Sequence, residues 1–76
     1  MSELVLQHDV ESVLANIIWA ARVTFNIDKY SLSPGGPDEW RLIFDSDNVA
    51  ALLKVKEMAE GAAVRVISYP VEEKTQ

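Results

Sequence analysis

Residue types that could perform catalysis or bind a metal gather at one place in the sequence, where His8, Asp9 and Glu11 stand within four positions. They follow a short β-prone segment and precede a helical pattern, and strand-to-helix junctions collect backbone N–H donors. Such a cluster could form an acid–base pair or a metal site, but a single histidine with no second His or Cys is a thin zinc ligand set. We expect instead that Asp9 caps the helix, Glu11 faces its dipole and His8 is solvated. The sequence thus predicts no catalytic residue, no metal and no cofactor.

Two other groups resemble binding motifs without meeting their requirements. Glu39, Asp45 and Asp47 lack the glycine turn and the terminal bidentate Glu of a calcium loop, so capping and solvation explain them better. Gly35 and Gly36 stand between two prolines and do not run into a helix, as the glycines of a phosphate-binding loop do. We therefore expect a hairpin loop there, and we expect that the protein is not an enzyme.

The size and composition of the chain indicate one folded domain. Its 76 residues leave room for a single core, and 49% of them are apolar against 25% charged. The sequence has no cysteine, which excludes disulfides and thiolate chemistry and fits a reducing compartment. We expect the domain at residues 1–71 and a flexible C-terminal tail at residues 72–76. A domain this short should be marginally stable alone, so self-association would help it.

The apolar runs and the net charge of the sequence bear on location and partners. No run approaches the roughly 18–20 apolar residues of a membrane span, and the first residues lack the basic start of a secretion signal. We therefore expect an unprocessed cytoplasmic protein with no membrane partner. The net charge of −5 has the wrong sign for binding phosphate, so nucleic acid is not an expected partner. An acidic domain could instead occupy a basic nucleic-acid groove on another protein.

Hydrophobic periodicity divides the chain into six elements. Alternation of apolar and polar residues indicates strands, three- and four-residue spacing indicates helices, and the run 34–37 is a turn signal. The expected strands are residues 3–7, 25–33, 39–45 and 63–69, and the expected helices run from residue 9 to about 24 and from residues 45–47 to Gly61.

This order, β-α-β-β-α-β, predicts an α+β ferredoxin-like fold with a four-stranded antiparallel sheet. The strand order is 4-1-3-2 with both helices on one face. Between helices and sheet we expect a core that includes Leu14, Ile17, Leu42, Phe44, Leu52 and Val66. The other face is expected to be open and to present Glu3, Val5, Gln7, Asp28, Tyr30, Arg41, Ile43, Arg65, Ile67 and Tyr69.

Exposed apolar side chains on this open face predict an interface. Trp19 is a further candidate on the first helix, where it either anchors a partner or shields the edge of the core. The candidate interface residues are Val5, Trp19, Tyr30, Arg41, Ile43, Ile67 and Tyr69. We expect a homodimer, formed either by face-to-face packing of open sheets or by edge-to-edge pairing.

The element order, together with Asp9-x-x-x-Val13-Leu14 and Phe25-Asn26-Ile27, resembles the ACT domain, a regulatory module that commonly binds amino acids. The resemblance covers residues 4–71. In that family an Asp-x-Pro-Gly-x-Leu segment enters the first helix and Asn-Ile or Asn-Val starts the second strand. Asp9, Leu14, Asn26 and Ile27 match; Glu11 and Ser12 replace proline and glycine. The ligand-binding residues that the resemblance implies are Asp9, Val10, Glu11, Ser12, Asn26 and Ile27.

Two functional hypotheses follow. In the first, the protein is a non-catalytic ACT-like regulatory module that self-associates or pairs with an enzyme subunit and binds an amino-acid-like effector. In the second, it is a small acidic protein-interaction or inhibitor domain with no small-molecule ligand. The two differ at the expected ligand loop, because Ser12 restricts close approach of a ligand to the backbone and Glu11 adds negative charge where a carboxylate would lie.

Overall fold

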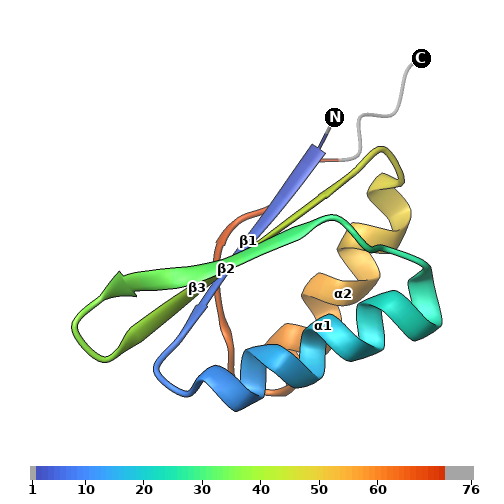
Figure 1. Cartoon of the computed structure of the whole chain (residues 1–76). Helices are drawn as coiled ribbons and strands as arrows, with labels where there is room; N and C mark the ends of the chain where they lie inside the picture. The colour runs from blue at the N-terminus through green and yellow to red at the C-terminus, as the bar shows by residue number, and fades with distance from the viewer. Residues whose placement is uncertain (1, 72–76) are drawn as a thin grey trace.

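Strands and helices follow one another in the order β-α-β-β-α-β along residues 2–71, which the computed structural model describes (Figure 1). This order confirms the predicted α+β fold. The elements are β1 Ser2–His8, α1 Glu11–Phe25, β2 Tyr30–Gly36, β3 Glu39–Ser46, α2 Val49–Gly61 and β4 Arg65–Ser68. The tail expected at residues 72–76 lies outside the described residues. No helix in the described part of the chain is both long and apolar enough to cross a membrane.

The four strands form one sheet in the order β2-β3-β1-β4, and every neighbouring pair is antiparallel. This is the predicted order 4-1-3-2 read from the other edge. Both helices lie on the same side of the sheet, so one sheet face is covered and the other is open (Figure 1). The ferredoxin-like arrangement is therefore present, with β1 and β3 at the centre.

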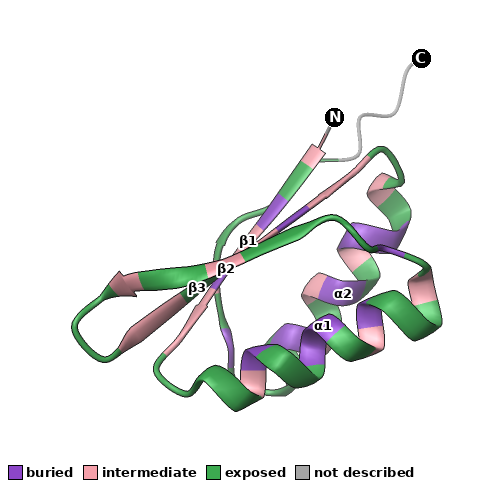
Figure 2. Ribbon diagram, viewed as in Figure 1, coloured by how far each residue is buried: buried purple, intermediate pink, exposed green. Residues whose placement is uncertain are grey.

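The core lies between the helices and the covered face, where buried residues of α1, α2 and the central strands meet (Figure 2). Leu4 pairs with Phe44 and Leu6 with Leu42 across the central strands, and all four side chains are fully buried. The predicted core is confirmed for Leu14, Ile17, Leu42, Phe44 and Leu52, while Val66 is partly buried and packs against them. Alternation along β1 and β3 thus sets which sheet face is apolar.

The second strand begins at Tyr30, and its predicted start at Phe25 is wrong. Phe25 is the last residue of α1, and Asn26 follows in the left-handed conformation with φ 58°. The amides of Asn26 and Ile27 both donate to the Ala21 carbonyl, which ends the helix. Asparagine tolerates left-handed backbone better than most residues, so the chain turns here instead of extending. Ile27 is buried in the core as part of the link between α1 and β2.

The loop predicted at residues 34–37 is also shorter in the structure. β2 continues to Gly36, Pro34 pairs with Trp40, and the turn consists of Pro37 and Asp38. Because β2 is an edge strand, a proline without an N–H donor can stand in it.

Tyr30 and Tyr69 lie on the helix side of the sheet, which corrects their predicted placement on the open face. Tyr30 pairs with Phe44, and their ring centroids are 6.4 Å apart. Lys56 of α2 holds its Nζ 4.5 Å from the centroid of the Tyr69 ring. Asp28, also predicted on that face, precedes β2 in the link from α1.

Tyr30 and Tyr69 lie on the helix side because the two-residue alternation is broken near β2 and in β4. The turn at Asn26 separates Ile27 from β2, so the phase of Ile27 does not carry over to Tyr30. In β4 the register shifts between Val66, opposite Leu6, and Ser68, opposite Val5. This irregularity leaves Ile67 as an extra residue and turns Tyr69 toward α2.

The second helix begins at Asn48–Val49 rather than within residues 45–47, and its end also differs in detail. The Asn48 side chain accepts a hydrogen bond from the Ala51 amide at 3.1 Å and so caps the helix. The helix ends at Gly61 as predicted, but the left-handed residue is Ala63, with φ 61°. Its amide donates to Glu60, and the Val64 amide donates to Ala59. β4 therefore starts only at Arg65 and is shorter than the predicted strand 63–69.

Candidate functional site

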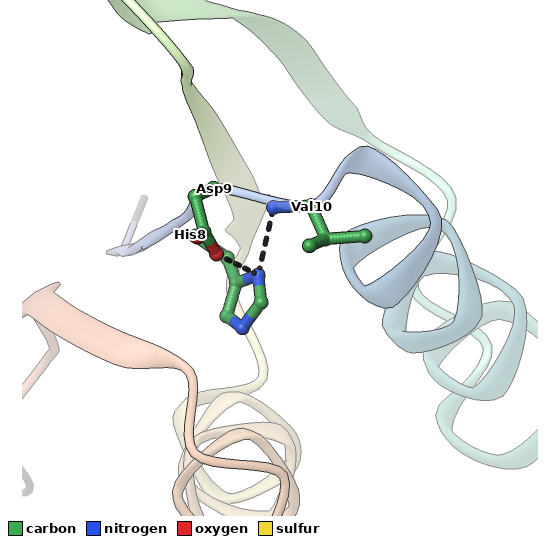
Figure 3. A network of polar contacts seen from close by, with 3 residues as sticks. All are labelled: His8, Asp9 and Val10. Atoms are coloured by element: carbon green, nitrogen blue, oxygen red, sulfur yellow. Dashed lines mark hydrogen bonds and ion pairs between the residues drawn. The ribbon is translucent and has the colours of Figure 1, made fainter.

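The segment that joins β1 to α1 holds the His8, Asp9 and Glu11 cluster. His8 is the last residue of β1, and its Nδ1 accepts a hydrogen bond from the Val10 amide at 2.9 Å (Figure 3). Asp9 Oδ1 lies 3.2 Å from the same nitrogen. Val10 is the N-cap residue of α1, so the prediction that Asp9 caps this helix is wrong. The side chain of His8 is 18% exposed, and the prediction that it is a solvated loop residue is wrong as well.

These two contacts of His8 exclude each other chemically. Nδ1 can accept the Val10 N–H only through its lone pair, which requires a neutral ring with the proton on Nε2. It can donate to Asp9 only when it carries a proton. His8 therefore serves the backbone at the start of α1, and its Nδ1 is not free to act on a substrate. Among residues 2–71, no three His, Asp or Glu side chains are grouped so that they could hold a metal ion.

A polar depression of about 330 Å³ adjoins this segment at the ends of β1, β3 and β4. It is lined by Gln7, His8, Asp9, Glu39, Ala63 and Arg65. The Gln7 amide Nε2 donates to Glu39 Oε2, which ties the first strand to the start of the third. The depression is open to solvent and its charges are mixed, so it lacks the enclosure and apolar walls of a typical small-molecule site.

The ligand-binding residues implied by the ACT resemblance fall into two groups that the fold keeps apart. Residues 9–12 lie at the N-terminal end of α1, whereas Asn26 and Ile27 follow its C-terminal end. A helix of 15 residues is about 22 Å long, so one chain does not bring the two groups together. Ile27 is also only 3% exposed, and its side chain contributes to the core.

A second polar depression, of about 190 Å³, lies between residues 26–29 and residues 45–47. Local sequence patterns do not indicate it, because these segments are brought together by the pairing of β2 with β3. The Asp45 amide donates to the Lys29 carbonyl at 3.0 Å and holds the two segments together. Asp45 Oδ1 is buried and has no hydrogen-bond partner among the described residues. A carboxylate oxygen in that state favours the approach of a cation or a hydrogen-bond donor.

Trp19 lies on the exposed side of α1 with 66% of its surface accessible, and Val23 one turn later is 64% accessible. Of the two interpretations of Trp19, shielding of the core edge does not fit this exposure. With Arg22, Asn26 and Asp28 these two side chains line a depression of about 330 Å³. A role for Trp19 as an interface anchor stays a prediction.

The open sheet face has an ordered pattern of charged and apolar rows. In the first row, Gln7 of β1 lies opposite Arg41 of β3 and Arg65 of β4. In the middle row, Val5 lies opposite Ile43. The register of the strands places these rows side by side, in the order basic, apolar and acidic.

In the third row of this face, Glu3 lies opposite Asp45. Like charges directly opposite each other on neighbouring strands destabilise a sheet. Ser31, opposite Ile43, and Ser33, opposite Arg41, extend the middle and basic rows onto β2. Of the predicted open-face aliphatic residues, Val5 and Ile43 are half-buried and Ile67 is 45% exposed.

Comparison with protein-family models, with curated proteins and with solved structures finds no match to this chain.

Proposed function

We propose that this chain is a non-catalytic association module that pairs with a second copy of itself through the open face of its sheet. The observation that carries the proposal is the row of Val5 and Ile43 at the centre of that face, on the two middle strands. Both helices lie on the other face of the sheet (Figure 1), and apolar area removed from water is the main source of association energy.

The small size of the domain supports the same proposal. A chain of 76 residues without cysteine has a limited core and no covalent crosslink. A partner that binds only the folded state stabilises it by mass action. Association would thus add stability that this chain cannot obtain from a larger core or a disulfide.

A regulatory role with an amino-acid-like effector, as the ACT resemblance implies, is an extension of this proposal and needs its own test. The two implied ligand segments are separated by the length of α1, and Glu11 lies in the first turn of that helix. An effector would stabilise the folded protein, so thermal unfolding should be measured with each common amino acid. A rise in the melting temperature with one of them supports the regulatory module. No response across the panel favours a pure interaction domain.

Light scattering and sedimentation velocity of wild type and Ile43→Asp test the association itself. We expect the wild type to dimerise with increasing concentration and Ile43→Asp to remain monomeric, because an interface at this position would bury an unpaired charge. Val23→Asp is the matched control, since Val23 is a similarly apolar residue on the exposed side of α1. A wild type that stays monomeric at high micromolar concentration contradicts the proposal. If only Val23→Asp loses the dimer, the interface lies on α1 and not on the open face.

A further inference from the structure

We infer that the second copy packs on the open face with its strands antiparallel to those of the first, so that Arg41 of each copy meets Asp45 of the other. This inference rests on the proposed association and specifies its symmetry.

The charged rows lie on either side of the apolar row. Arg41 and Asp45 belong to the same strand, with Ile43 midway between them, and alternate residues of a strand share a face. Four residues of strand span about 13 Å, so the two charges are well separated within one chain. The open face therefore has a basic end and an acidic end.

The charges at both ends lack ion-pair partners among residues 2–71. Among the described residues, Arg41 and Arg65 are in no ion pair, and Asp45 Oδ1 is buried without a hydrogen bond. Glu3 adds a second carboxylate directly opposite Asp45. Two carboxylates facing each other are unfavourable alone and become favourable when a cation is placed against them.

Neighbouring charges reduce this polarity at both ends. Glu39, which accepts the Gln7 amide, and Asp9, which lines the same depression as Arg65, lie near the basic end and offset part of the charge of its two arginines. Lys29, whose carbonyl accepts the Asp45 amide, lies at the acidic end beside Asp45 and Glu3. The acidic end keeps its sign, and at the other end Arg41 and Arg65 are the cations that the strand register places on the open face.

Symmetry leaves two ways to stack two copies of this face with their strands aligned. A two-fold axis parallel to the strands places basic row over basic row and acidic row over acidic row, which is repulsive. A two-fold axis across the strands, through the row of Val5 and Ile43, reverses the second copy. The same apolar residues then meet at the axis, and Arg41 faces Asp45 of the other copy twice. Stacked sheets lie about 10 Å apart, a distance that an arginine side chain can bridge with help from the opposite residue.

The size of the face sets the expected strength of this dimer. At the usual spacings between strands and residues, the four strands give it a projected area of roughly 400 Å². That is small beside the about 800 Å² that each partner buries in a standard interface. The dimer should thus be weak, concentration-dependent and sensitive to salt, because exposed ion pairs at its ends are screened.

Charge exchange between Arg41 and Asp45 tests the inference. Sedimentation velocity at low salt should find dimerisation weakened roughly tenfold or more in Arg41→Asp and in Asp45→Arg, and regained in the double variant. Arg41→Lys should dimerise like the wild type because it keeps the charge. If Asp45→Arg does not fold, Asp45→Asn takes its place, and it should also weaken dimerisation because it removes the negative charge. Circular dichroism melts establish that each variant compared is folded.

The possible outcomes separate this inference from the proposed function. If Ile43→Asp dissociates the dimer while the double variant is no better than either single variant, the association holds and the antiparallel stacking is wrong. Stronger dimerisation of Arg41→Asp would instead indicate the parallel stacking, in which like rows meet. If wild type, Arg41→Asp and Ile43→Asp all dimerise equally, the partner lies elsewhere, for example at the β2 edge, and both the face and the register are rejected.

Discussion

His8 Nδ1 lies 2.9 Å from the amide nitrogen of Val10, so an imidazole ring takes the first backbone N–H at the entrance to α1. In a capping box the side chain three residues inside the helix binds the N-cap amide. Here His8, two positions before the N-cap, binds this amide instead. The N-cap itself is Val10, whose side chain has no hydrogen-bond acceptor. His8 belongs to the cluster that could have formed an acid–base pair, but its Nδ1 binds the local backbone instead.

This contact predicts a defined tautomer of His8. Nitrogen-15 spectra at pH 8 should place the proton on Nε2, because Nδ1 accepts the Val10 amide. His8→Ala should lower the free energy of unfolding by about 0.5–1.5 kcal/mol, the usual loss for one hydrogen bond. Ser12→Ala, an exposed change in the same turn, is the control and should have little effect. A ring protonated on Nδ1 in the neutral state would contradict the prediction.

The same assignment predicts that His8 holds no metal. After loading with zinc and dialysis against a zinc-free buffer, elemental analysis should find less than stoichiometric zinc in both the wild type and His8→Ala, because one histidine offers too few ligands. Zinc retained at one ion per chain in the wild type and lost in His8→Ala would overturn this.

The end of α2 should be stabilised by glycine at position 63. Ala63 has φ 61°, a conformation that costs an L-residue about 1–2 kcal/mol and glycine much less. Ala63→Gly should therefore raise the free energy of unfolding by about 0.5–1 kcal/mol, measured by urea denaturation. Ala62→Gly is the matched control: its φ of −97° gives glycine no advantage, so that variant should be no more stable than the wild type. Equal effects of the two changes would contradict the assignment of the left-handed residue.

Phe44 should be the most costly side chain to truncate. It is fully buried at the centre of the covered face, opposite Leu4 and Tyr30. Phe44→Ala should cost about 3–5 kcal/mol, enough to unfold a domain this small. Trp19→Ala removes another large aromatic ring, but from an exposed position, and should change stability by less than about 0.5 kcal/mol. A Phe44→Ala melting curve close to that of the wild type would mean that the β3 register is wrong.

The amino-acid sequence by itself determined the order of elements and most of the core. Leu4 and Leu6 in β1, and Leu42 and Phe44 in β3, stand at alternate positions of uninterrupted strands, so their common face can be read locally. Leu14 and Ile17 follow helical spacing in the same way. Periodicity within one continuous element needs no knowledge of its neighbours, and the right-handed crossover of β-α-β units then places both helices on the same face.

Only the tertiary structure decided the composition of the open face and of the site. The left-handed turn at Asn26 and the irregularity at Ile67 each shift the alternation, and the pairing partner of the strand sets the new phase. For that reason Tyr30 and Tyr69 lie with the helices, while Arg41 and Asp45 remain on the open face. Glu3 lies opposite Asp45, and Gln7 lies opposite Arg41 and Arg65. These pairs depend on the register between strands that are far apart in the sequence. Local patterns specify which residues share a strand face, but hydrogen bonding between distant strands decides which of those residues meet.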